Sequence, residues 1–206
     1  MSEEPVKRRY ESPARRAAAE ATRDAICQAA EDLLMRDGYA RTSIRAVAAR
    51  AGVSEATVYL AFPNKPALLD ATILRAIRHS GSEPLTQIRE APALELLPRL
   101  SASIAAVMGH AARLITIGES AAAIDADLRP VRDRALERVR SAMLSIAERL
   151  HAEGLLRDGL SGQAAGDAIY AIANPTTYLR LVEDCGLPPE QYAPWLTATT
   201  EAVLLR

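Results

Sequence analysis

Three hydroxyl-bearing residues, Ser54, Thr57 and Tyr59, stand at spacings that would put them near the exposed side of a short helix. Hydroxyls such as those of Ser54 and Thr57 can contact base edges in the major groove, and a phenol such as that of Tyr59 can contact a phosphate oxygen. Glu55 adds an acceptor for the amino group of cytosine, and Ala56 offers an apolar contact for a thymine methyl group. These residue types indicate nucleic-acid binding rather than catalysis.

Two short helices joined by a tight turn would position these side chains. Ser43 is a suitable N-cap for the first helix, and Ser54 is one for the second. Gly52 between them supplies the turn, because glycine adopts a positive φ without a steric penalty. Val58 and Phe62 form the inward face of the second helix. An ordinary corner in a helical bundle has the same turn, but the polar outer face favours a DNA-binding helix-turn-helix.

The residues around this pair of helices resemble the TetR (tetracycline-repressor) family of bacterial regulators. The upstream matches are Thr22, Arg23, Ile26, Ala29, Ala30, Leu33, Leu34, Asp37, Gly38, Tyr39, Thr42 and Ser43. The downstream matches are Gly52, Val53, Ser54, Thr57, Val58, Tyr59, Phe62, Pro63, Asn64, Lys65, Leu68 and Leu69. Leu60 and Ala61 depart from the family, which often has aromatic or histidine side chains there, so the operator sequence stays open.

The resemblance and the residue chemistry together give a set of candidate DNA contacts. They are Thr42, Ser43, Arg45, Ser54, Glu55, Ala56, Thr57, Tyr59, Leu60 and Lys65. The resemblance assigns phosphate contacts to Thr42, Ser43, Tyr59 and Lys65. Residues 54–62 contain no Arg, Lys, Asn or Gln, the side chains that read guanine and adenine with two hydrogen bonds. Arg45 is the candidate for guanine, with a phosphate contact as an equal alternative.

Composition and charge are consistent with a small helical protein that presents one end to DNA. The chain has 206 residues, 49% of them apolar, and few segments alternate with the period of a strand, so we expect an all-α fold. The net charge is −1, yet residues 5–66 hold eleven Lys and Arg against seven Asp and Glu. A basic N-terminal module on an acidic body suits a protein that approaches phosphates.

The pattern predicts three parts and about nine helices. Residues 1–12 form a flexible basic arm, residues 13–80 a helix-turn-helix domain with a connecting helix at its end, and residues 85–206 a larger helical domain. Within the larger domain we expect helices at 92–117, 120–126, 129–153, 161–184 and 189–205. Gly118 would separate the first two, and Pro175 would break the fourth.

For the larger domain the resemblance implies a pocket for a small-molecule effector and a homodimer interface. Candidate pocket residues on otherwise apolar stretches are Met108, His110, Arg113, Met143, Tyr170, Asn174 and Tyr178. Ordinary core or surface positions are the alternative for each of them. The interface would use the last two helices, with Tyr178, Leu181, Tyr192, Trp195 and Leu196 as its apolar residues.

Other kinds of function have less support. His79, His110 and His151 are isolated, Cys27 and Cys185 lack metal-ligand spacing, and no glycine-rich phosphate loop is present, so we expect no cofactor, no metal and no enzyme. The first residues lack the apolar stretch of a secretion signal, and no run approaches the ~18 apolar residues of a membrane span, which indicates a cytoplasmic protein.

The sequence therefore predicts a ligand-responsive transcriptional regulator, most simply a repressor released from a palindromic operator on double-stranded DNA by a small molecule. A helical protein-interaction adaptor, or a helical-bundle enzyme that retains a helix-turn-helix, is the alternative. Neither the effector nor the target genes follow from the residues.

Overall fold

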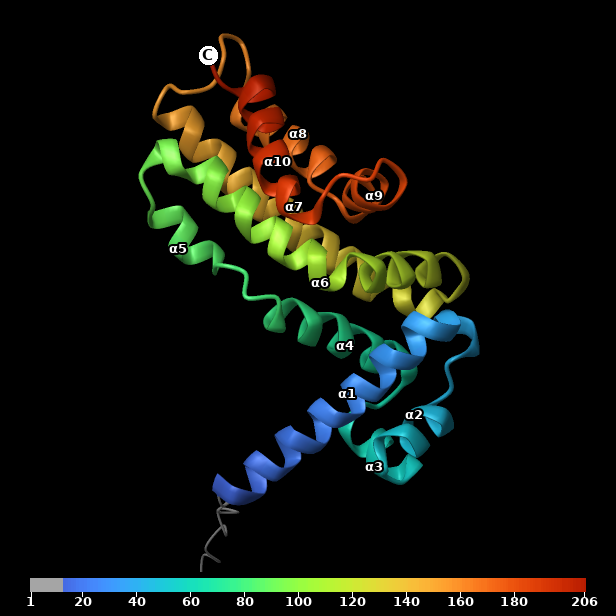
Figure 1. The fold of residues 1–206 in the computed structure, drawn as a ribbon. Coiled ribbons are helices and arrows are strands. Elements are labelled where there is room, and N and C mark those ends of the chain that lie inside the picture. The colour runs from blue at the N-terminus through green and yellow to red at the C-terminus, as the bar shows by residue number, and fades with distance from the viewer. Residues whose placement is uncertain (1–12) are drawn as a thin grey trace, which may run out of the picture.

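The computed structural model describes residues 13–206, and the basic arm predicted at 1–12 lies outside this range. The described chain holds ten α-helices and no strand, which confirms the all-α class (Figure 1). They are α1 (Pro13–Arg41), α2 (Ile44–Ala51), α3 (Glu55–Ala61), α4 (Lys65–His79), α5 (Leu85–Glu90), α6 (Leu96–Ile124), α7 (Arg129–Ala152), α8 (Gly162–Ile172), α9 (Pro175–Leu179) and α10 (Pro189–Leu204).

The helices α2 and α3 begin and end at the residues that their caps dictate. The side chain of Ser43 accepts a hydrogen bond from the backbone N–H of Ala46, and Ser54 does the same for Thr57. Gly52 ends α2 in the left-handed conformation, with φ 69°. Asn64 then caps α4 through a 2.8 Å hydrogen bond from the N–H of Ala67. The local chemistry of the sequence is therefore sufficient to fix these boundaries.

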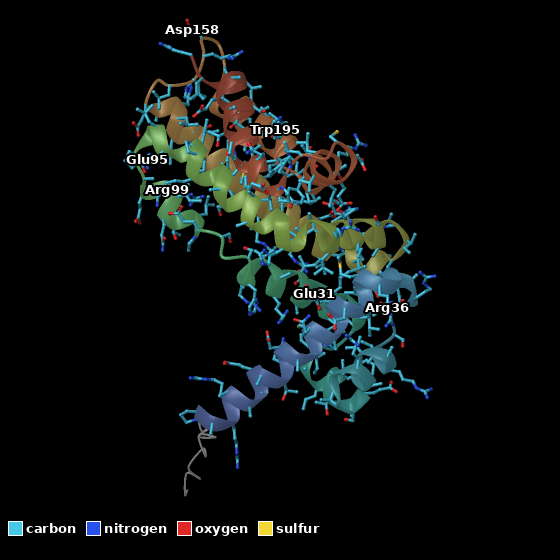
Figure 2. The ribbon with its side chains drawn as sticks, in the orientation of Figure 1. Glu31, Arg36, Glu95, Arg99, Asp158 and Trp195 are labelled. Carbon is cyan, nitrogen blue, oxygen red and sulfur yellow. The ribbon has the colours of Figure 1, made fainter. Side chains whose placement is uncertain are left out.

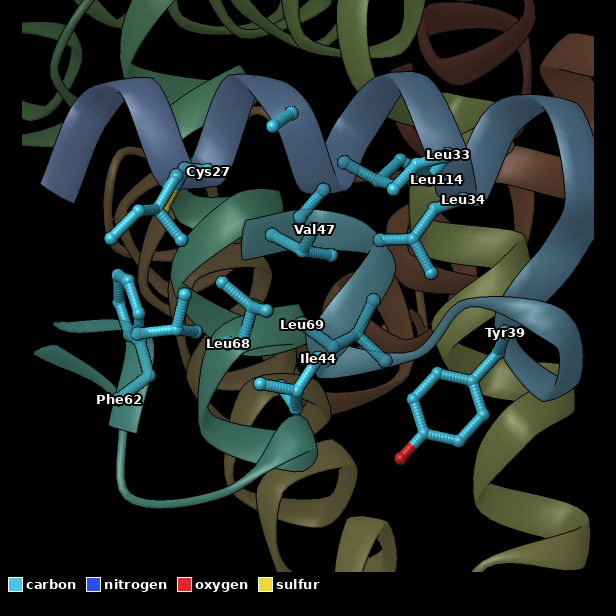
Figure 3. Close-up of a cluster of buried hydrophobic side chains, with 14 of the residues drawn as sticks. Cys27, Leu33, Leu34, Tyr39, Ile44, Val47, Phe62, Leu68, Leu69 and Leu114 are labelled. Atoms are coloured by element: carbon cyan, nitrogen blue, oxygen red, sulfur yellow. The ribbon is translucent and has the colours of Figure 1, made fainter. Parts of the chain in front are cut away.

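Two clusters of buried side chains form the interior. The first joins α1–α4 with the second half of α6, and it includes Leu33, Val47, Phe62 and Leu69 beside Leu114 of α6 (Figure 3). The second joins the first half of α6 with α5, α7, α8, α9 and α10. The loop predicted near residues 81–84 does separate α4 from α5. Because α6 contributes to both clusters, packing does not divide the chain at that loop.

The helix α6 corrects two expectations. Gly118 does not interrupt it, since α6 runs on to Ile124 without a separate helix at 120–126. Gly118 is buried where α6 crosses α4, and a Cβ there would come within 2.9 Å of the Ile73 side chain. Glycine therefore allows a close helix crossing rather than a break.

By length and composition, the segment Ala93–Ile124 could also cross a membrane, although charged residues interrupt its apolar stretches. Its neighbours give it a different role. It packs against α1, α4, α7, α9 and α10, and in Figure 1 it runs between α4 and α10. Through these contacts α6 contributes buried side chains to both hydrophobic clusters.

The remaining differences are local. The short helix α5 was not anticipated, and it packs its Ile88 into the second cluster. The predicted break at Pro175 is confirmed, because α8 ends at Ile172 and α9 begins at Pro175. Both cysteines are free thiols; Cys27 is buried and Cys185 is exposed.

Candidate nucleic-acid interface and internal cavity

The outer face of α3 is exposed in the described chain. Ser54, Glu55 and Ala56 at its start are exposed. The Tyr59 side chain is 51% exposed, and Leu60 is 90% exposed, more than any other large apolar residue of the described chain. Val58 faces inward and is fully buried. A short helix anchored on one side and open on the other has the geometry of a recognition helix.

Several predicted contact hydroxyls already have partners within the protein. Ser43 and Ser54 accept the capping hydrogen bonds of α2 and α3. The hydroxyls of Ser54 and Thr57 also lie 2.8 Å apart and share a hydrogen bond. Capping uses a lone pair of the serine oxygen, so a hydroxyl proton that is not used in the Ser54–Thr57 hydrogen bond can still be donated to a phosphate oxygen.

Thr42 and Lys65 are more buried and more fully bonded within the protein than their residue types suggested. Thr42 is only 4% exposed, and its hydroxyl donates to the carbonyl of Gly38. The Lys65 ammonium donates to the carbonyl of Tyr39 at 2.6 Å and lies 3.9 Å from the centre of the Tyr39 ring. Burial lowers the pKa of Lys65. The Thr42 hydroxyl is therefore largely covered and already donates within the chain, and Lys65 holds the C-terminal end of α1.

The basic side chains near α2 and α3 divide into paired and unpaired groups. Arg50 forms an ion pair with Asp32, and Arg23 lies over the Phe62 ring while it donates to the carbonyl of Ala61. Arg45 is exposed at the start of α2 and has no hydrogen-bond or ion-pair partner among residues 13–206. The exposed and unpaired Arg45 guanidinium is thus available for the base contact predicted for it.

Residues 26–72 match the family model "Bacterial regulatory proteins, tetR family". The chain belongs to the TetR family. The match spans the cap residues, the turn at Gly52 and the whole of α2 and α3, and it identifies the chain as a DNA-binding regulator of a family that is not enzymatic. No curated protein matches the chain significantly.

Solved structures with this fold cover nearly the whole TetR-family chain. NalD of Pseudomonas aeruginosa, a secondary repressor of a multidrug efflux pump, has a TM-score of 0.71 and 24% identity, over 91% of this chain and 98% of its own. SmeT of Stenotrophomonas maltophilia, also an efflux-pump repressor, has a TM-score of 0.67 and 20% identity, over 91% and 92%. A protein of Saccharomonospora viridis, solved with choline, has a TM-score of 0.69 and 17% identity, over 91% and 99%. Identities this low show the shared fold.

A cavity of about 220 Å³ opens between α4, α6 and α7 of this TetR-family protein. Apolar side chains from all three helices line it, including Ile73, Ile115 and Val139. Among these apolar side chains, Glu119 of α6 contributes a carboxylate to the cavity lining, and burial raises its pKa. Sequence reasoning missed these residues. The available signal was the single acidic residue at 119 in the apolar run of residues 114–124.

The seven residues predicted for the pocket lie elsewhere, and none of them lines this cavity. Met108, Met143 and Tyr178 are buried in the second cluster. His110 and Arg113 are on the surface, where Arg113 forms an ion pair with Glu183. Tyr170 packs half-buried against the second cluster.

Asn174 has its polar groups satisfied within its own turn. Its carbonyl oxygen caps α9 by accepting from the N–H of Thr177, and its amide donates to the carbonyl of Ala171 at 2.7 Å. Pro175 has no N–H to offer the carbonyl of Ala171, and the Asn174 amide supplies this hydrogen bond instead. The polar groups of Asn174 at this break are therefore used in local hydrogen bonds.

The apolar residues predicted for the dimer interface are mostly interior. Tyr192 and Leu196 are fully buried, and Tyr178 packs edge-on against Tyr192 with ring centres 4.8 Å apart. Trp195, labelled in Figure 2, stacks on Tyr192 with ring centres 5.8 Å apart and is half-buried. These aromatic side chains hold α9 and α10 onto the subunit's own core.

One hydrogen bond joins the C-terminal end of α1 to the turn before α7. The Tyr39 hydroxyl donates to the Asp125 carboxylate at 2.8 Å. Burial and this carboxylate raise the pKa of Tyr39, so the hydroxyl keeps its proton. Leu128, three residues after Asp125, lines the cavity. The hydrogen bond thus connects the helix-turn-helix region with one wall of the cavity.

Proposed function

We propose that this TetR-family protein is a homodimeric repressor that binds a two-fold symmetric operator and releases it when a small molecule occupies the cavity between α4, α6 and α7. The outer face of α3 carries the DNA-binding part of the proposal. A leucine side chain that is 90% exposed beside a half-exposed tyrosine, on a helix capped and anchored from behind, is suited to the major groove. Such a protein works where the chromosome is, in the bacterial cytoplasm.

The position of α4 supports coupling between cavity and operator. Leu69, Ile73 and Ile77 of α4 line the cavity. On α4 as well, Arg75 forms ion pairs with Asp24 and Glu31 of α1, at 2.8 Å and 3.1 Å. Figure 2 labels Glu31 on the part of α1 nearest α4. A ligand that displaces α4 therefore shifts the helix to which the DNA-binding helices are attached.

The energy required for this coupling is modest. A 100-fold loss of operator affinity corresponds to about 2.7 kcal/mol of difference in ligand affinity between two conformations. One ligand buried among apolar side chains reaches this difference, provided that it contacts α4 in only one of them.

The roles of the α2 and α3 side chains can be separated on DNA. Arg45→Ala should reduce discrimination at one base pair by about 1–3 kcal/mol, whereas Tyr59→Phe should weaken binding to all sequences alike. Leu60→Ala should lower the preference for one thymine. Affinities for an operator selected from random DNA, and for variants changed at each base pair, measure all three. A protein that binds no duplex tighter than random DNA contradicts the proposal.

The dimer needs a test that spares the subunit core. Deletion of residues 187–206 would remove the buried Tyr192, Leu196 and Leu204, so it would unfold the subunit whatever the interface is. Exposed apolar positions on the last helices are better targets. Ala164→Glu on α8 and Val203→Glu on α10 should together give a folded monomer by light scattering. Each substitution places one carboxylate on either side of a two-fold interface, so both subunits bring charges into it. A variant that remains dimeric excludes this surface.

A further inference from the structure

Charged side chains line the cavity between α4, α6 and α7, and they differ in whether they have a partner within the protein. Glu119 of α6 is half-buried, and its carboxylate forms no hydrogen bond or ion pair within residues 13–206. Asp70 of α4 and the two arginines of α7, Arg132 and Arg138, also line the cavity. The kind of ligand depends on which of these charges lacks a partner.

The arginines are better satisfied than Glu119. Arg132 donates through both Nε and Nη2 to the carboxylate of Asp133, at 2.9 Å and 2.6 Å. Arg138 is exposed to solvent, which hydrates its charge. Arg132 is close enough to favour the ionised form of Glu119, but burial has the larger effect, and the pKa of Glu119 is raised. Glu119 therefore lacks a full counter-charge.

The walls around this carboxylate are apolar and the space is small. Leu69, Ile73 and Ile77 of α4 face Ile115 of α6, and Leu128 closes the side toward α7. The volume of about 220 Å³ is below the ~300–1,000 Å³ common for drug-sized ligands. A suitable occupant has a compact apolar body and one positively charged group.

We infer that this cavity binds a small organic cation, such as an arylalkyl ammonium, with Glu119 as the counter-ion for its charged group. The inference rests on the proposed function, because it names the chemical class of the effector. Apolar side chains of α4 and α6 would contact the body of the ligand. Binding would then supply the partner that the protein does not give Glu119.

The test compares three probes of similar size that differ in charge: phenethylammonium, 2-phenylethanol and phenylacetate. Calorimetry on the full-length protein, without DNA, should show phenethylammonium binding about tenfold more tightly than 2-phenylethanol, a difference of about 1.4 kcal/mol. Phenylacetate should bind more weakly than either.

Two variants and a control assign the effect to Glu119. Glu119→Gln should remove the preference for the cation and leave the affinity for 2-phenylethanol unchanged. Glu137→Gln is the matched control, because it removes the same charge from an exposed position of α7 outside the cavity. Ala135→Phe, which fills the cavity from α7, should abolish binding of both probes while circular dichroism reports an intact fold.

Some outcomes would overturn the inference. If phenylacetate bound most tightly of the three probes, Arg132 and Arg138 would be the counter-ions of the ligand in place of Glu119. An unchanged cation preference in Glu119→Gln, or no binding of any probe at millimolar concentration, would equally exclude Glu119 as the counter-ion of a ligand site. Operator affinity is measured separately on the same proteins. Failure of probe binding with intact operator binding refutes this inference alone, whereas loss of sequence-specific DNA binding refutes the proposed repressor.

Discussion

The helix pair α2–α3 and the helices α6–α10 are both amphipathic, yet their side chains were predictable to very different degrees. In α2–α3 each boundary depends on one residue and its neighbours three or four positions away, such as Ser54 with Thr57. In α6–α10 the position of a side chain depends on helices distant in the sequence, as when Gly118 of α6 meets Ile73 of α4. Local hydrogen bonds can be read from residue order, but contacts between distant helices cannot.

The comparison also shows that the two regions are not independent bodies. The second half of α6 completes the core of the helix-turn-helix region, and its first half completes the core around α10. A substitution in the second half of α6 should therefore destabilise the helix-turn-helix region, and one in its first half should destabilise the region around α10.

Paired substitutions on α6 give the largest expected effects. Leu114→Ala, in the first cluster, and Leu100→Ala, in the second, each remove a buried leucine and should lower the free energy of unfolding by about 2–5 kcal/mol. Denaturant unfolding measures both. Only Leu114→Ala should increase hydrogen exchange in α1–α4 and weaken operator binding. Equal effects of the two substitutions on α1–α4 would show a single cooperative core instead of two linked clusters.

Tyr39→Phe tests the contact between the two regions. It removes the hydroxyl that donates to Asp125, a hydrogen bond to a charged acceptor that contributes about 1.5–3 kcal/mol. We expect a lower melting temperature and a changed ligand concentration for half-release of the operator. Affinity for the operator without ligand should change less. Tyr59→Phe, which removes an exposed hydroxyl of α3, is the control and should leave the melting temperature unchanged.

Two N-cap serines give the smallest effects and the finest comparison. Ser54→Ala in α3 and Ser161→Ala in α8 each remove a side chain that accepts a backbone N–H, at 3.1 Å and 3.2 Å. Each should cost about 1 kcal/mol of stability. Only Ser54→Ala should also reduce DNA affinity, as measured by fluorescence anisotropy. Reduced DNA affinity in Ser161→Ala would mean that α8 influences the operator-binding helices directly.

The sequence by itself determined the helix-turn-helix, its caps, the turn at Gly52, the all-α class and the break before Pro175. These features follow from propensities and hydrogen bonds between residues within about four positions of each other, which the order of residues contains. The polar outer face of the second helix indicated DNA binding, the family resemblance added the effector pocket and the homodimer as expectations, and the family match of residues 26–72 confirms the family.

Tertiary structure alone decided which apolar side chains fill the core and which line a cavity. Tyr178, Tyr192 and Leu196 have the same character as interface residues, but their neighbours bury them within the subunit. Lys65 has the chemistry of a phosphate contact, yet the carbonyl of Tyr39 lies within 2.6 Å of it. The physical reason is that burial depends on how distant helices pack together, and an amphipathic pattern specifies that a face is covered without specifying by what.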